Sequence, residues 1–107
     1  MKGLIIDTGK EPVIATLPDM LEPLQNLCGG YLSMMRFPTD SAALLYVSTV
    51  QLPPVPNRLY REKWYYGRLL IVGLRNNRFI GLTTEQLEQY RTQFRHTSVP
   101  EKAKGAY

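Results

Sequence analysis

The sequence predicts an α+β fold: a mostly antiparallel or mixed sheet of about six strands, with two helices packed on it. Hairpin signals recur along the chain, whereas only two short segments have helical spacing, which gives the order ββα, ββ, ββ, α. Hairpins that alternate with isolated helices are typical of such sheets rather than of doubly wound parallel ones. The 107 residues, 44% of them hydrophobic and 21% charged, suit one globular domain.

The chain begins with an expected hairpin. Residues 2–8 are apolar and β-branched, and Asp7–Lys10 has the composition of a turn. The apolar run over 12–15 then returns as the second strand.

The first helix is predicted from Leu21, Leu24 and Cys28, which fall at i, i+3 and i+7. Pro23 is tolerated only in a first helical turn, so the helix is either distorted or begins later. Gly29-Gly30 ends it, because glycine adopts the left-handed cap conformation at little cost.

A second hairpin follows, with strands over 31–37 and 43–50. The run Pro53-Pro54-Val55-Pro56 then excludes a helix interior and a central strand and favours an extended loop. Residues 58–66 fit either a helical turn or an irregular loop.

The third predicted hairpin has strands over 69–75 and 78–82, joined by Asn76-Asn77, because asparagine tolerates a positive φ. We assign residues 1–95 to the domain and expect residues 96–107, which are mostly polar, to form a loosely ordered tail.

The last helix has the clearest start signal in the chain. Thr83 is the expected N-cap, and Gln86 completes a capping box. Leu82 and Leu87 occupy the positions of a hydrophobic staple. The side chains expected to line one face of this helix are Leu87, Tyr90 and Phe94.

Charge is unevenly distributed along the chain. The net charge is +4, made up of −2 over residues 1–54 and +6 over residues 55–107. The basic second half suggests an anionic partner, and the overall charge argues against a protein that mimics DNA. The chain has neither a signal-peptide pattern nor an apolar run of membrane-spanning length, and its single cysteine excludes an internal disulfide. We therefore expect a cytoplasmic protein.

Catalytic and metal-binding motifs are not recognisable in the sequence. Cys28 and His96 are the only cysteine and histidine, too few for a transition-metal site. A Cys–His catalytic pair competes with a simpler interpretation: Cys28 is a small hydrophobic residue on a helix face, and His96 favours the end of a helix. We predict no enzyme and no cofactor.

A basic and aromatic stretch, residues 57–78, is the candidate binding surface. Its candidate residues are Asn57, Arg58, Tyr60, Arg61, Lys63, Trp64, Tyr65, Arg68, Arg75 and Arg78. Trp, Tyr and Arg dominate protein-binding hot spots, and arginines interleaved with aromatics also suit single-stranded nucleic acid. The third interpretation is that the aromatics pack in the core beneath a solvated basic face.

Short motifs in a particular order carry a family resemblance. They are Gly29-Gly30-Tyr31, Pro53-Pro54 with Asn57-Arg58, Gly67 through Gly73, and Phe79–Thr83. On these residues the chain resembles the "domain of unknown function 3846" family over roughly residues 2–94. The resemblance implies a gene of phages, plasmids or conjugative elements and a bacterial host cell, and it implies no particular activity.

The functional prediction combines these observations. We expect a non-enzymatic binding protein of a mobile element that engages a host or element-encoded protein. The sharpest form is an inhibitor of a defence system, of the anti-CRISPR or antirestriction type. The alternative is a nucleic-acid-binding accessory protein that uses residues 57–78.

Overall fold

The structure is a computed structural model that describes residues 1–48 and 55–96. Eight strands and two helices follow one another along this part of the chain. In order they are β1 (Lys2–Ile6), β2 (Val13–Thr16), α1 (Leu21–Cys28), β3 (Leu32–Arg36), β4 (Ala42–Val47), β5 (Pro56–Tyr60), β6 (Lys63–Tyr66), β7 (Leu69–Arg75), β8 (Arg78–Ile80) and α2 (Thr84–Gln93).

One six-stranded sheet forms the centre of the molecule. Its strand order is β2-β1-β7-β4-β3, with β8 also paired to β7, and all of these pairs are antiparallel. β7 is buried from Leu69 to Leu74, which fits its apolar sequence and its central place. The predicted α+β fold with a sheet of about six strands is confirmed. β5 and β6 form a separate two-stranded sheet.

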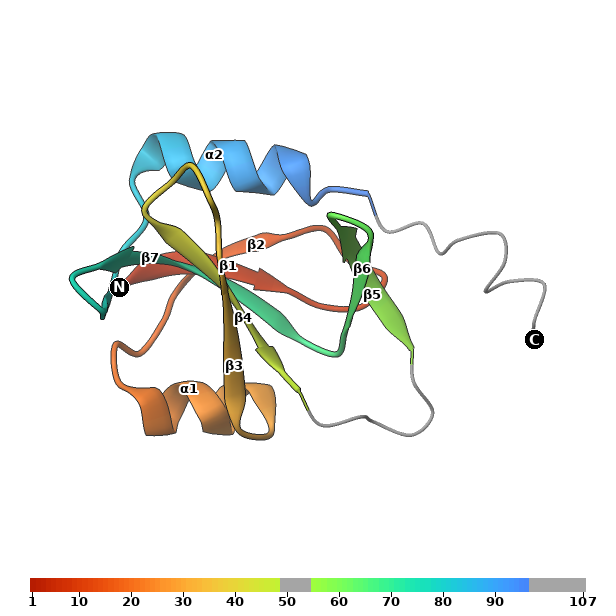
Figure 1. Cartoon of the computed structure of the whole chain (residues 1–107), viewed down its shortest axis with the longest axis horizontal. Helices are drawn as coiled ribbons and strands as arrows, with labels where there is room; N and C mark the ends of the chain where they lie inside the picture. Colours follow the sequence, from red (N-terminus) through yellow and green to blue (C-terminus); the bar gives the residue numbers. More distant parts are fainter. Residues whose placement is uncertain (49–54, 97–107) are drawn as a thin grey trace.

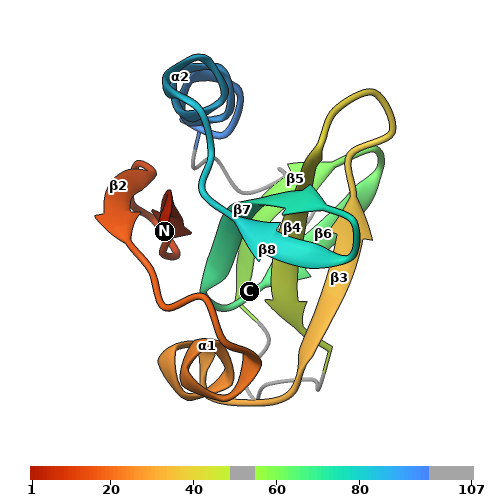
Figure 2. The same cartoon turned by 90° about the vertical axis from the view of Figure 1, so that its left-hand side faces the viewer.

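The two helices cover opposite faces of the sheet. Figures 1 and 2 show α2 on one side and α1 on the other, with the strands between them. Alternate residues of β7 pack into the two core layers on either side of the sheet, because successive side chains of a strand point to opposite faces. Ile71 belongs to the core cluster of Leu87 and Tyr90, and Val72 to that of Leu24 and Cys28. No helix in the described parts of the chain is long and apolar enough to cross a membrane.

The predicted end of the first helix at Gly29-Gly30 is confirmed. Gly29 is the C-cap of α1 and has a φ of 84°. Pro23 lies in the first turn, where a backbone N–H has no partner within the helix, so the proline costs little. Leu24 and Cys28 are buried as predicted, but Leu21 is 52% exposed. Its position at the first helical residue places it beyond the edge of the core.

The capping box predicted for the last helix is present. Thr83 Oγ1 accepts a hydrogen bond from the Gln86 backbone N–H at 3.1 Å, and Gln86 Oε1 accepts one from the Thr83 N–H at 2.9 Å. Both staple residues, Leu82 and Leu87, are buried, as are Tyr90 and Phe94.

The three predicted hairpins are confirmed, with small differences at their ends. Asn76 and Asn77 have φ values of 50° and 62° and form the tight turn between β7 and β8. Pairing in the second hairpin starts at Leu32 instead of residue 31, and β8 ends at Ile80. The predicted strand end at 49–50, the prolines at 53–54 and the expected tail from 97 onward lie outside the described residues.

One local prediction was wrong. Residues 58–66, expected to be a helical turn or an irregular loop, form most of the β5–β6 hairpin. Pro56, placed in the extended loop by the sequence, is the first residue of β5. A proline is tolerated there because it starts an edge strand.

Candidate functional site

The β5–β6 hairpin is built around a tight two-residue turn. Arg61 and Glu62 have φ values of 50° and 65°, in the left-handed region that hairpin turns of this kind require. The turn places Leu59 opposite Trp64 and Arg58 opposite Tyr65. Because side chains alternate along a strand, the hairpin has two distinct faces.

The inner face of the hairpin packs on the core through aromatic rings. Tyr60 meets Phe37 edge-on at 5.3 Å between ring centroids, and Tyr65 meets Tyr46 edge-on at 4.9 Å. The Lys63 ammonium lies 5.1 Å from the centroids of both Tyr46 and Tyr65, a favourable cation–π distance. Burial raises the pKa of Tyr65, against the opposing effect of Lys63.

The outer face of the hairpin is the candidate site. It carries Leu59, 52% exposed, Tyr66, 39% exposed, and the half-buried Trp64 between them. Arg61, which is exposed, lies in the turn at one end of this face. We call Leu59, Trp64, Tyr66 and Arg61 the hairpin face. Figure 1 shows the hairpin at the end of the molecule away from the β7–β8 turn.

A buried polar pair fixes the position of the hairpin. Arg58, 2% exposed, donates through Nε to the carbonyl oxygen of Phe94 at 2.7 Å and through Nη2 to that of Lys10. Its Nη1 reaches the carbonyl and side-chain oxygens of Asn57 at 3.0 and 2.7 Å. Burial lowers the pKa of Arg58.

Asn57 extends this network to the strands of the main sheet. Its Nδ2 donates to the carbonyl oxygens of Ile6 at 2.9 Å and Gly67 at 2.5 Å. The buried side-chain polar atoms of the described residues all have partners. Asn57, Arg58 and the buried Tyr65 therefore hold the fold together and offer no surface to a partner, contrary to the expectation that they contribute to binding.

The remaining predicted residues do not form one surface with the hairpin. Arg68 donates to the Asp7 carboxylate at 2.7 Å and to the Leu27 carbonyl oxygen at 3.2 Å, and the hydrogen bond to Asp7 raises the pKa of Arg68. Arg75 and Arg78 flank the β7–β8 turn, at the far end of the sheet (Figures 1 and 2). Of the ten predicted residues, Arg61 and Trp64 belong to the hairpin face, whereas Tyr60 and Lys63 lie on the inner face of the hairpin.

Leu59 and Tyr66 belong to this face but were not among the predicted residues. Their alternation with Arg58 and Tyr65 in the run 58–66 is a strand signal. The prolines before it and the charged Arg61-Glu62 turn obscured that signal.

Cys28 and His96 are not arranged as a catalytic pair. Cys28 packs in the α1 layer, whereas His96 is exposed just after α2, on the opposite side of the sheet. Burial raises the pKa of Cys28 to about 11, so its thiol is protonated at neutral pH. Within residues 1–48 and 55–96, no three His, Cys, Asp or Glu side chains gather as metal ligands would.

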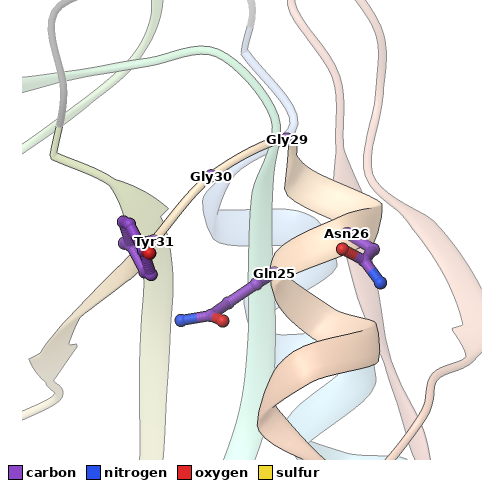
Figure 3. Close-up of a pocket in the computed structure, with 5 residues that line it drawn as sticks. All are labelled: Gln25, Asn26, Gly29, Gly30 and Tyr31. Atoms are coloured by element: carbon purple, nitrogen blue, oxygen red, sulfur yellow. The ribbon is translucent and has the colours of Figure 1, made fainter.

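A hollow of about 360 Å³ lies at the C-terminal end of α1, lined by Gln25, Asn26, Gly29, Gly30 and Tyr31. Figure 3 shows the Gln25 side chain directed toward Tyr31 and that of Asn26 directed away. Tyr31 is 81% exposed. None of the lining residues carries a charge at neutral pH, so the hollow holds hydrogen-bonding groups and one aromatic ring but no acid–base pair.

Comparison with known proteins gives one match. The family model described as "Domain of unknown function (DUF3846)" matches residues 1–95. No curated protein and no solved structure matches the chain.

Proposed function

We propose that this chain, which belongs to the domain of unknown function DUF3846 family, is a non-enzymatic protein that binds another protein through the hairpin face. The observation that carries the proposal is the contrast between the two sides of one hairpin. Its inner side is fixed by Arg58 and packed aromatics, while its outer side leaves Leu59 and Tyr66 in solvent.

Two properties of the hairpin face suit protein recognition. Exposed aromatic and aliphatic side chains that cluster together mark binding sites, and Trp, Tyr and Arg contribute most to such interfaces. The buried anchor keeps the face in one arrangement before a partner arrives, which reduces the entropy lost on binding. Arg61 in the turn favours a partner whose apolar pocket has an acidic rim.

Single-stranded nucleic acid along residues 57–78 has less support than a protein partner. A strand-binding groove needs several cations along one continuous path. Of the basic residues in this stretch, Arg58 is buried, Arg68 is bound to Asp7, and Arg75 and Arg78 lie at the other end of the sheet.

The biological setting is also part of the proposal. Its support is the resemblance described above, which implies a phage or other mobile element and the cytoplasm of a bacterial host. In that setting the partner is a host or element-encoded protein, and inhibition of a CRISPR or restriction defence is the sharpest form.

The experiment is a pull-down from lysate of a bacterial host, run with and without nuclease, using the whole chain and two variants. The double variant Leu59→Ser/Trp64→Ser removes the centre of the hairpin face. The control Tyr31→Ala removes a ring that is 81% exposed and lies at another site. Proteins captured by the native chain and by Tyr31→Ala, but lost in a folded double variant, support the proposal. Capture that survives in the double variant, or that depends on nucleic acid, would contradict it.

A further inference from the structure

We infer that the turn between β7 and β8 is a phosphate-binding site formed by the facing pair Arg75 and Arg78. This inference concerns the end of the molecule opposite the hairpin face (Figures 1 and 2). The test of this inference is therefore independent of whether the hairpin face binds a protein.

Two of the arginines face each other across the hairpin. Arg75 pairs with Arg78 in the β7–β8 register, and only Asn76 and Asn77 separate them along the chain. Side chains at paired positions lie on the same face of a sheet with their Cβ atoms about 5 Å apart. The backbone thus holds the Cβ atoms of two exposed arginines next to each other.

A third arginine contacts the same turn from the other face of the sheet, because Arg36 pairs with Ala43 on the Val72 face. Arg36, at the end of β3, donates through Nη2 to the Asn77 side-chain oxygen at 2.9 Å. This is the one hydrogen bond that its guanidinium makes within the described part of the chain. Its other N–H groups remain free to donate to a ligand.

No carboxylate within the described residues neutralises these arginines. The ion pairs found there are Arg68–Asp7, Arg91–Glu88 and Arg95–Glu11. Asp40 lines a hollow of about 360 Å³ together with Arg36, but its oxygens already accept hydrogen bonds from Ser41, Gln86 and Tyr90.

Like charges at paired positions destabilise a sheet, so the Arg75–Arg78 pair weakens the hairpin unless an anion bridges it. The guanidinium group matches phosphate in particular, because its planar N–H fork donates two parallel hydrogen bonds to two oxygens. A phosphate at the turn accepts from Arg75 and Arg78 together, and Arg36 adds positive charge at the turn from the other face. The shared chemistry is the phosphate group, whether from a small phosphorylated ligand or from a nucleic-acid backbone.

The test follows the arginine side-chain N–H signals by NMR while the chain is titrated at constant ionic strength. One arm uses inorganic phosphate and the other an oligothymidylate. The variant is Arg75→Gln/Arg78→Gln, and the charge-matched control is Arg91→Gln/Arg95→Gln, which removes two exposed arginines in and just after α2 instead.

Saturable shifts of the Arg75 and Arg78 signals are expected in the native chain. The affinity read from the Arg36 signal, which both variants retain, should fall roughly tenfold or more in the Arg75→Gln/Arg78→Gln variant and stay unchanged in the control. Saturation by inorganic phosphate shows that a phosphate group alone binds the site, as a small phosphorylated ligand would. Saturation by the oligothymidylate alone identifies a nucleic-acid backbone. The inference is overturned if neither probe gives saturable shifts, or if Arg91→Gln/Arg95→Gln weakens binding as much as the Arg75→Gln/Arg78→Gln variant does.

Discussion

Arg58 and Phe94 are joined by a buried hydrogen bond, in which the guanidinium Nε donates to the carbonyl oxygen of the residue that caps α2. The bond connects the β5–β6 hairpin to the end of the last helix, 36 residues further along the chain. The carbonyl end of a helix carries partial negative charge, so a cation is favoured there. The hairpin face is therefore coupled to the packing of α2.

This coupling predicts that Arg58→Ala strongly destabilises the fold. The substitution leaves the carbonyl oxygens of Lys10 and Phe94 without their donor, and hydrogen bonds to charged groups contribute on the order of 1.5–3 kcal/mol each. We expect the free energy of unfolding in urea to fall by about 3 kcal/mol or more. Arg61→Ala, at the exposed turn, is the control and should change it by less than about 0.5 kcal/mol. Equal effects of the two substitutions would show that the buried network is unimportant.

The capping box of α2 predicts a smaller loss for Thr83→Ala. Its hydroxyl accepts the Gln86 N–H, and removal of such a cap costs about 1 kcal/mol. Thr84→Ala removes the neighbouring threonine, which lies inside the helix and is not its cap. Thermal unfolding followed by circular dichroism should show a clear decrease for Thr83→Ala, whereas Thr84→Ala should be neutral or slightly stabilising.

We expect the free energy of unfolding to fall in acid as Asp40 becomes protonated. Burial alone would raise the pKa of Asp40, but hydrogen bonds from Tyr90, Gln86 and Ser41 outweigh it and lower the pKa below 3.8. The folded state therefore holds the carboxylate ionised where the unfolded chain has begun to bind a proton. The contribution is complete above pH 3.8 and is lost as the pH falls through the folded pKa.

Urea unfolding measured from pH 7 down to pH 2, for the native chain and for Asp40→Asn, isolates this contribution. The difference between the two free energies of unfolding should shrink as the pH falls below 3.8. A difference that stays constant over this range would mean that Asp40 does not titrate differently in the two states.

For the Arg75–Arg78 pair at the β7–β8 turn, we expect one substitution to raise the stability of the fold and to abolish phosphate binding. Arg78→Glu turns a repulsive cross-strand pair into an attractive one, which should add about 0.5–1 kcal/mol to the free energy of unfolding. The same substitution should abolish phosphate binding. If the variant is no more stable than the native chain, then repulsion between Arg75 and Arg78 does not destabilise the hairpin.

How far the sequence predicts this protein depends on how local each signal is. The Thr83–Gln86 cap and the Asn76-Asn77 turn were predictable because a few adjacent residues determine their geometry. The Arg61-Glu62 turn was not, because those residues rarely adopt a positive φ and do so here under the constraint of the surrounding packing.

The candidate site was predicted in part. Composition located it in residues 57–78, but could not separate exposed from buried members. The burial of Arg58 depends on Lys10 and Phe94, which are distant in sequence and become neighbours only through the tertiary fold. Arginine is mostly found at protein surfaces, so a single sequence favours the opposite expectation for it.

The central position of β7 has a consequence for how the chain folds. β7 is the strand that joins the N-terminal hairpin to the β3–β4 hairpin, since β1 and β4 both pair with it and not with each other. Leu4 pairs with Ile71, so much of the sheet depends on contacts between distant parts of the chain, which makes folding slow. During synthesis on the ribosome, the first two-thirds of the chain therefore cannot form the sheet until β7 has been made. Until then the apolar faces of the earlier strands stay uncovered. A fragment that stops before Leu69 should remain unfolded rather than form half of the domain.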